Sequence, residues 1–237
     1  MYEEVAPPPP LRGVARCVWR SAAAAPKRIV PDGCLDLVVG DTGVFVAGPD
    51  TTAWSSVTRP GEVLRGVRFT PGRAAAVLGV AADELRDRRV TLPELWGREG
   101  ELLTERLLSG DLSPARAVVS LLPDVPPPDP AVAALVARLD AGATRVADAA
   151  GQVGVAERRL RRRFVQAIGY GPATYLRVSR FQRAVSLAPR APGLAALAAA
   201  AGYADQAHLS REVRALTGLT PRAYFAGRST VDEVRSA

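Results

Sequence analysis

Cysteine, histidine, methionine and aromatic residues are scarce in this chain of 237 residues. It contains two cysteines, one histidine and one methionine, and 5% of its residues are aromatic. The single histidine cannot form a metal site or a catalytic triad without partner residues, and two cysteines are too few for a four-cysteine zinc site. No stretch approaches the ~20 apolar residues that a membrane-spanning helix needs. We therefore expect no catalytic residues, no metal, no cofactor and no membrane partner.

The cysteines and the first residues indicate a compartment. Cys17 and Cys34 are the only cysteines, and the N-terminus is acidic and then proline-rich, without an apolar signal segment. A pair of cysteines without a secretion signal is typical of a reduced, cytoplasmic protein. We expect residues 1–12 to be a mobile leader.

Positive charge is unevenly spread along the chain, whose formal net charge is +7. Residues 128–237 hold 16 basic residues against 8 acidic ones, whereas residues 1–127 hold 15 basic against 16 acidic. The basic half is therefore the part expected to bind nucleic acid. Arginine outnumbers lysine 30 to 1 in the whole chain, so arginine abundance alone is weak evidence.

The basic half contains one pattern twice. The first copy consists of Ala150, Gly154, Leu160, Phe164, Gly169, Pro172 and Tyr175. The second consists of Ala198, Gly202, Leu209, Val213, Gly218, Pro221 and Tyr224. The copies are offset by 48 residues at the alanine and glycine and by 49 from the leucine onward. The second copy therefore has one extra residue in its turn.

The spacing predicts a helix-turn-helix in each copy. A small alanine lets two helices cross closely, and a glycine four residues later permits a sharp turn because glycine adopts positive φ freely. The leucine and the bulky residue four positions on then share the inner face of the second helix. A linking helix over 172–188 would span ~25 Å. That length is close to what is needed to place the two outer helices in successive major grooves, ~34 Å apart on one face of a duplex.

The outer face of the second helix in the first copy is strongly basic. A helix fits the major groove of B-DNA, where arginine donates two hydrogen bonds to guanine, and arginine also neutralises phosphates. Arg158, Arg161 and Arg162 share one face and are predicted to contact bases. Arg159 and Arg163 are predicted to contact phosphates. The alternative is a solvated cationic face without a partner.

The corresponding helix of the second copy is chemically different. Its outward residues include Gln206, Ala207, Ser210 and Arg211. Glutamine pairs with adenine, serine with either base type, and a small alanine can meet a thymine methyl group. His208 is interpreted as a residue at the helix start, either near the DNA backbone or packed on the turn.

These residues resemble the DNA-binding domain of the AraC/XylS family of bacterial transcription regulators, from about residue 129 to 228. The segments 202–213 and 217–224 carry the most specific part of the resemblance. The family usually has serine at positions 156 and 207 and phenylalanine at 209 and 213. This chain has Ala156, Ala207, Leu209 and Val213 there. A serine at position 156 would cap the helix, and its loss typically costs ~1 kcal/mol.

The N-terminal half contains short β-branched runs separated by turn signals, which predict a small antiparallel sheet. The strands are expected at 29–30, 35–39, 44–47 and 63–69, with helices at 73–78, 82–88, 92–96, 98–108 and 114–121. This half resembles an N-terminal domain of unknown function that is often fused to such a DNA-binding unit, and the resemblance implies no ligand.

Few residues of this half suggest chemistry. Asp32 and Asp36 are either functional carboxylates or, more commonly, turn and strand-capping residues. Cys34 lies in an apolar run and is interpreted as a small buried hydrophobe rather than a nucleophile. The three tryptophans either line a small-molecule pocket or fill the core.

The expected fold is an α+β N-terminal domain followed by an all-α domain of two helix-turn-helix units joined by a linking helix. The expected boundaries are an N-terminal domain over 1–122, a proline-rich linker over 123–130, a DNA-binding domain over 131–228 and a tail over 229–237. Helices in the second domain are expected at 131–141, 145–153, 157–167, 172–188, 194–201, 205–216 and 221–226.

The function expected from these features is sequence-specific DNA binding by a transcription regulator rather than an enzyme. Double-stranded DNA is the expected partner. RNA polymerase, an unidentified small-molecule effector and a second copy of the chain are further candidates. One alternative is a constitutive DNA-binding protein whose N-terminal half only oligomerises; another is an enzyme with a basic domain. Arg180 of the linking helix is expected either to reach phosphate or to brace the fold against an acidic partner.

Overall fold

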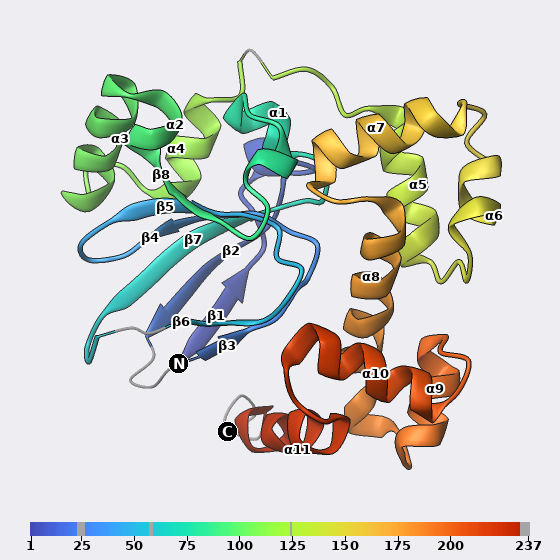
Figure 1. Ribbon diagram of the computed structural model, residues 1–237. Helices are drawn as coiled ribbons and strands as arrows, with labels where there is room; N and C mark the ends of the chain where they lie inside the picture. Colours follow the sequence, from blue (N-terminus) through green and yellow to red (C-terminus); the bar gives the residue numbers. More distant parts are fainter. Residues whose placement is uncertain (23–26, 57–58, 124, 233–237) are drawn as a thin grey trace.

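A computed structural model describes residues 1–22, 27–56, 59–123 and 125–232. Figure 1 shows a twisted sheet with helices above it and, beside it, a helical part in which two groups of helices are joined by one vertical helix. The predicted fold class is confirmed, because strands dominate the first part and the described residues after 130 form helices without strands.

A six-stranded antiparallel sheet forms most of the N-terminal part. Its strand order is β1-β2-β7-β4-β5-β8, and β3 pairs with β6 in a separate two-stranded sheet. The strands are β1 Tyr2–Val5, β2 Ala15–Ala22, β3 Lys27–Ile29, β4 Asp36–Val39, β5 Val44–Ala47, β6 Trp54–Ser56, β7 Val63–Phe69 and β8 Arg89–Thr91.

The interpretation of residues 1–12 as a mobile leader is wrong. β1 is an edge strand that pairs with β2 in the register Tyr2 to Ser21, and the 3₁₀ helix η1 (Pro9–Leu11) follows it. Leu11 is fully buried in the core. A four-residue edge strand with two consecutive glutamates shows too little alternation to be recognised from sequence.

Helices pack on one face of the sheet and lie above it in Figure 1. They are α1 Ala74–Leu78, the 3₁₀ helix η2 Ala82–Glu84, α2 Leu92–Trp96, α3 Arg98–Leu108 and α4 Pro114–Ser120. Val39, Val46 and Phe69 from the sheet pack with Leu107 and Val118 from these helices, and all five are essentially inaccessible to solvent. The expected helix over 82–88 is only the short η2.

Residues from 130 onward form a bundle of helices close to the predicted positions. The helices are α5 Pro130–Asp140, α6 Val146–Gly151, α7 Glu157–Ile168, α8 Pro172–Leu187, the 3₁₀ helix η3 Ala188–Arg190, α9 Leu194–Ala201, α10 Gln206–Thr217 and α11 Pro221–Asp232. The last helix extends beyond the expected 221–226. Residues 233–237 of the expected tail and residue 124 of the expected linker lie outside the described residues.

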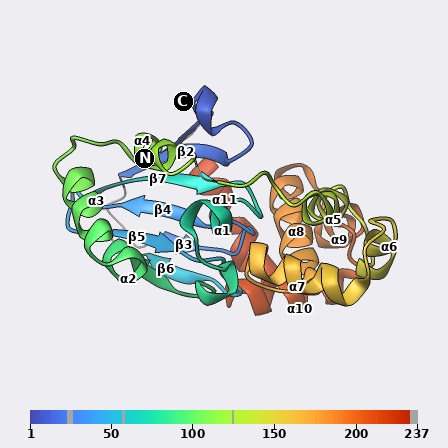
Figure 2. The same cartoon turned by 90° about the horizontal axis from the view of Figure 1, so that it is seen from above.

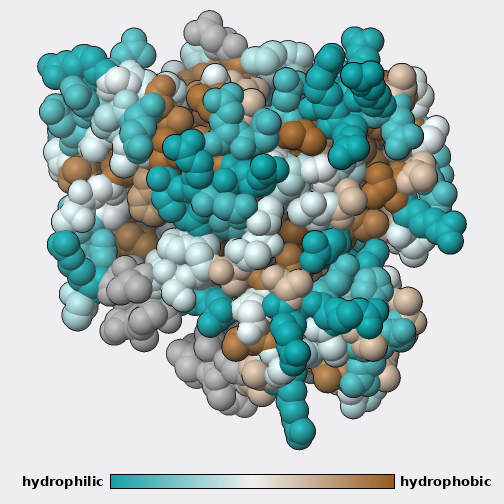
Figure 3. Space-filling model, viewed as in Figure 1, coloured by the Kyte–Doolittle hydropathy of each residue, from teal (hydrophilic) through white to brown (hydrophobic). Residues whose placement is uncertain are grey.

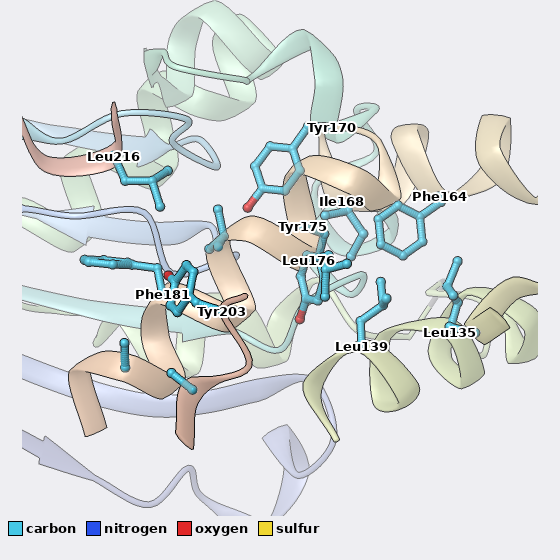
Figure 4. Packing of buried hydrophobic residues seen from close by; sticks show 14 of the residues in the cluster. Leu135, Leu139, Phe164, Ile168, Tyr170, Tyr175, Leu176, Phe181, Tyr203 and Leu216 are labelled. Atoms are coloured by element: carbon cyan, nitrogen blue, oxygen red, sulfur yellow. The ribbon is translucent and has the colours of Figure 1, made fainter. Parts of the chain in front are cut away.

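The helical part has its own apolar core. Leu135 and Leu139 from α5, Phe164 and Ile168 from α7, and Leu176 from α8 converge in Figure 4. All but Leu176 are fully buried, and Leu176 is 6% exposed. This core fixes α8 between the two helix groups. Among the described residues, no helix is long and apolar enough to cross a lipid bilayer.

Candidate nucleic-acid interface

Each predicted turn has the geometry that its spacing requires. Gly154 and Gly202 have φ values of 72° and 86°, a region that side chains disfavour. Ala150 and Ala198 are buried where the paired helices meet. The structure therefore contains two helix-turn-helix units, α6–α7 and α9–α10, and we call α7 and α10 the reading helices.

The first reading helix is sharply divided into an apolar and a basic face. Leu160, Phe164 and Ile168 are buried, while the row of arginines between them points outward. The predicted base-contacting side chains and the first phosphate-contacting one are all exposed: Arg158, Arg159, Arg161 and Arg162. None of these four forms an ion pair within 4 Å among the residues that the structure describes.

Arg163 differs from its neighbours. It is half-buried and forms an ion pair with Asp129, the residue that caps the N-terminus of α5. Its charge therefore already has a partner within the fold. Sequence spacing placed Arg163 on the outer face but gave no sign of Asp129, which lies 34 residues earlier.

The starts of the two reading helices are capped differently. Asp205 precedes α10 and its side chain accepts a hydrogen bond of 2.6 Å from the backbone nitrogen of His208. Ala156 precedes α7 and provides no such bond. The backbone N–H groups at the start of α7 therefore have no side-chain acceptor, whereas one of those at the start of α10 is capped by Asp205.

The predicted residues of the second reading helix lie mostly on its open side. Gln206, Ala207 and Arg211 are exposed. Ser210 is partly buried, and its hydroxyl donates a hydrogen bond of 2.8 Å to the carbonyl of Gln206. That bond occupies its donor while leaving an oxygen lone pair free.

His208 is packed on the turn, which was one of its two expected positions. Its Nδ1 lies 3.3 Å from the backbone nitrogen of Ala204, and its ring meets Tyr203 edge-on. Its Nε2 lies 3.3 Å from a carboxylate oxygen of Glu212, one helical turn later. The imidazole is therefore tied on both sides to the protein.

Glu212 is the centre of a buried charge cluster that sequence reasoning missed. Its Oε1 lies 3.5 Å from Arg177 and 3.7 Å from Arg180, both on α8. Arg180 is 8% exposed, and its guanidinium lies over the ring of Tyr203. Of the two roles expected for Arg180, the structure shows the brace within the fold. The only feature of the sequence that could have indicated this cluster is the four-residue spacing of His208 and Glu212, which places them on one helix face.

The two reading helices lie on the same side of the molecule. Seen from above, α7 and α10 both lie along one edge of the helical part (Figure 2). α8 separates them in the view of Figure 1. Hydrophilic side chains gather over the region of α7 on the face shown in Figure 3. The outer residues of both helices are therefore mostly exposed to solvent, on helices that lie along the same edge of the helical part.

The end of each reading helix contacts the N-terminal part of the chain, residues 1–123, which contains the sheet and is called the sheet-bearing part below. α7 packs on α1 and η2, and a Cβ on Gly169 would lie 2.3 Å from Pro49 and 2.9 Å from the Ala82 carbonyl oxygen. At α10, the backbone nitrogen of Ala53 donates a hydrogen bond of 2.7 Å to Leu216. The two parts of the chain are thus joined at both reading helices.

The N-terminal residues singled out from sequence form a polar cluster. Asp32 accepts a hydrogen bond from the backbone of Cys34, as a turn residue does. Asp36 accepts a bond of 2.6 Å from the indole of Trp19 and lies 3.3 Å from Arg68. Burial raises the pKa of Asp36 to about 6, although Arg68 opposes this. Burial also raises the pKa of the Cys34 thiol well above its usual value, which disfavours the thiolate.

No group of three or more histidine, cysteine or acidic side chains suited to a metal ion occurs among the described residues. Of the two roles expected for the tryptophans, packing in the core is the one seen for Trp19 and Trp96. Trp19 is buried, whereas Trp54 and Trp96 are partly exposed, with Arg89 stacked over Trp54.

Comparisons with known proteins find a family match for each part of the chain. Residues 149–227 match a family described as a helix-turn-helix domain, and residues 3–91 match a domain of unknown function. No curated protein matches the chain significantly.

Among solved structures, the chain is similar to ToxT from Vibrio cholerae O395, with 12% identity over 88% of this chain and 95% of that chain and a TM-score of 0.47. Another structure of Vibrio cholerae ToxT covers 94% and 97%, with 10% identity and a TM-score of 0.48. Wild-type ToxT from Vibrio cholerae strain SCE256 bound to an unsaturated fatty acid covers 90% and 94%, with 10% identity and a TM-score of 0.47.

Proposed function

We propose that the chain regulates transcription by sequence-specific binding to promoter DNA, through an AraC-type helix-turn-helix domain over residues 149–227 that follows an N-terminal domain of unknown function. The reading helices α7 and α10 enter adjacent major-groove segments of one duplex. The observation that carries this proposal is the exposure of both outer faces on one side of the helical part.

The first reading helix supplies most of the charge. Arg158, Arg161 and Arg162 are free of protein carboxylates and share one face, so they read base edges. Arg159 contacts phosphate. Arg163 reaches phosphate only if its bond with Asp129 opens, so we assign it the smaller share of the binding free energy.

The second reading helix supplies selectivity with little charge. Gln206, Ala207 and Arg211 project from its first two turns, where a helix in the major groove meets base edges. Ser210 accepts hydrogen bonds from bases through its free lone pair. His208 orients this surface from the turn beside it, since its ring is held by Ala204 and Glu212.

Selection of bound sites from random duplexes tests the proposal. We expect two conserved segments centred one helical turn apart, about 10 base pairs. The logarithm of affinity should fall by roughly 0.9 per neutralised phosphate for each unit rise in the logarithm of salt concentration. Enrichment of no sequence, or a complex insensitive to salt, contradicts the proposal.

The N-terminal domain modulates DNA binding in this proposal. Its contacts with the ends of both reading helices support that role, because any change in the sheet-bearing part reaches them. The alternative is constitutive DNA binding with an N-terminal half that only oligomerises. A DNA affinity that no small molecule alters, together with a dimer that forms through the N-terminal half, would favour this alternative.

A further inference from the structure

A cavity of about 480 Å³ lies between the two parts of the chain. Strands and turns of the N-terminal sheet supply one wall, including Arg16, Asp32 and Arg68. The other wall is α8 with the end of α5. The volume is within the range of ~300–1,000 Å³ typical of small-molecule sites.

Two arginines on opposite walls of this cavity lack a carboxylate partner. The only hydrogen bond of the Arg16 guanidinium among the described residues is to the Sγ of Cys34, at 3.6 Å. A thiol is a weak acceptor. Within the described ranges, Arg183 on α8 donates only to backbone carbonyls, those of Ala201, Leu139 and Asp140. Neither arginine has a carboxylate oxygen within 4 Å in the described part of the chain.

Arg68, in contrast, has more carboxylate neighbours than its one positive charge can neutralise. Its single guanidinium lies 3.2 Å from Glu4 and 3.3 Å from both Asp32 and Asp36. Three carboxylates therefore share one cation, and the cluster carries excess negative charge. Glu4 and Asp32 line the cavity beside Arg68. An ammonium group placed there would gain charge-assisted hydrogen bonds.

Neutral polar groups from the linking helix complete the wall. Ser179 donates a hydrogen bond of 2.8 Å to Asp140, and Gln182 donates one of 2.6 Å to the carbonyl of Pro31. The latter bond joins α8 directly to the turn that carries Asp32. A molecule in the cavity would therefore touch the sheet and the linking helix together.

We propose that this cavity binds a small zwitterion of the amino-acid or short-peptide class, with its ammonium at Asp32 and Glu4 and its carboxylate at Arg16 and Arg183. Charged and hydroxyl-bearing walls disfavour an apolar ligand, because such a ligand would displace water from these polar side chains without replacing its hydrogen bonds. A purely anionic ligand would be repelled by the carboxylates around Arg68. This inference rests on the proposed function, for which it names the effector class.

The position of the cavity explains how such a ligand would act. It bridges the sheet-bearing part and α8, which separates the two reading helices. A ligand that binds one relative arrangement of these parts more tightly than another shifts the population toward it, and with it the affinity for DNA.

The test uses the full chain and measures thermal stability and calorimetric binding with the common amino acids and their glycyl dipeptides at millimolar concentration. We expect at least one zwitterion to stabilise the protein. Its N-acetylated and its carboxamide forms should each bind about tenfold or more weakly, because each loses one charge-assisted contact.

A pair of variants places the ligand in the cavity. Arg16→Gln removes the cation that has only a weak partner and should weaken binding about tenfold. Arg20→Gln on the same strand is the matched control, since Arg20 is exposed and does not line the cavity. Asp32→Asn should weaken the zwitterion and leave the N-acetylated form unchanged.

The inference is overturned if no member of the panel stabilises the protein. It is also overturned if Arg16→Gln does not weaken binding. Both outcomes leave the proposed function intact if the protein selects a DNA site. Conversely, zwitterion binding by a protein that selects no DNA site would overturn the proposed function and leave the ligand site standing.

Discussion

The guanidinium of Arg28 donates a hydrogen bond of 2.7 Å to the carbonyl oxygen of Thr217, 189 residues later in the chain. Thr217 is the last residue of α10, and Arg28 lies in β3. The bond satisfies one of the carbonyls that a helix end leaves free, with a cation at the negative end of the helix dipole. The sheet-bearing part thus holds the second reading helix by its C-terminus.

Arg28→Ala should loosen that end. We expect the free energy of unfolding to fall by about 1 kcal/mol and amide hydrogen exchange to accelerate in the last turn of α10. Exchange mass spectrometry on the free protein measures this. Arg65→Ala, an exposed arginine of β7, should leave exchange in α10 unchanged. Equal exchange in the wild type and in Arg28→Ala would show that the bond carries no restraint.

Arg162→Ala should weaken specific DNA binding by about 1–3 kcal/mol and relax selectivity at one base pair. The side chain is exposed and has no ion pair in the described structure, so its loss leaves the fold intact. Titration of the selected site and its single-base variants measures the effect. Arg116→Ala on α4 removes the same charge far from the reading helices and serves as the control. An unchanged profile for Arg162→Ala would mean that α7 does not read bases.

Ala156→Ser should raise the free energy of unfolding by about 1 kcal/mol, because the new hydroxyl accepts a bond from a free backbone donor of α7. Ala207→Ser is the matched control. It lies inside α10, whose start Asp205 already caps, and should leave stability nearly unchanged. Chemical denaturation without DNA compares the two, and an equal gain from both would refute the capping explanation.

Glu212→Gln should destabilise the second helix-turn-helix unit by about 3 kcal/mol, because it leaves Arg180 buried without a counter-charge. Glu157→Gln, at an exposed site in the first turn of α7, controls for the loss of one helical carboxylate. Chemical denaturation measures the free energy of unfolding of both variants. A small effect of Glu212→Gln would mean that the cluster is hydrated enough to tolerate the change.

Asp36 should make stability depend on pH. Its pKa is raised from 3.8 to about 6, chiefly by burial. Between about pH 4 and pH 6 the folded protein keeps a proton that the unfolded chain has lost, so the free energy of unfolding falls as pH rises through this window. Asp36→Asn should flatten this part of the profile, whereas Asp41→Asn, at an exposed turn, should not. A wild-type profile that rises through the window would contradict the shift.

The helical part was predictable because its signals are local. Ala150, Gly154, Leu160 and Phe164 lie within one helix pair, so spacing alone fixed the turn, the crossing and the buried face. The sheet was harder to predict. β1, β2, β6 and β8 were missed, since β1 is short and acidic and the pairing of β2 with β7 joins segments some 45 residues apart in the chain. Pairing at such distances leaves little trace in local patterns.

The candidate site divides in the same way. Exposure of the α7 arginines followed from helical periodicity, and their contact with DNA stays a prediction. The partners of Arg163, Arg180 and His208 did not follow, because Asp129 and Glu212 meet them only through tertiary packing. Likewise, nothing in the sequence indicated that Arg16 and Arg183 line one cavity.

Gly169, just after α7, packs against Pro49 and Ala82, and Arg28 is bonded to Thr217 at the end of α10. The sheet-bearing part therefore contacts both reading helices, in addition to α8 that joins them. Binding to an operator whose half-sites lie one base pair farther apart would require both of these contacts to break before α8 itself bends. The N-terminal domain would then set how much variation in half-site spacing the protein tolerates. Exchanging that domain would change the choice of promoter without altering any residue that contacts a base.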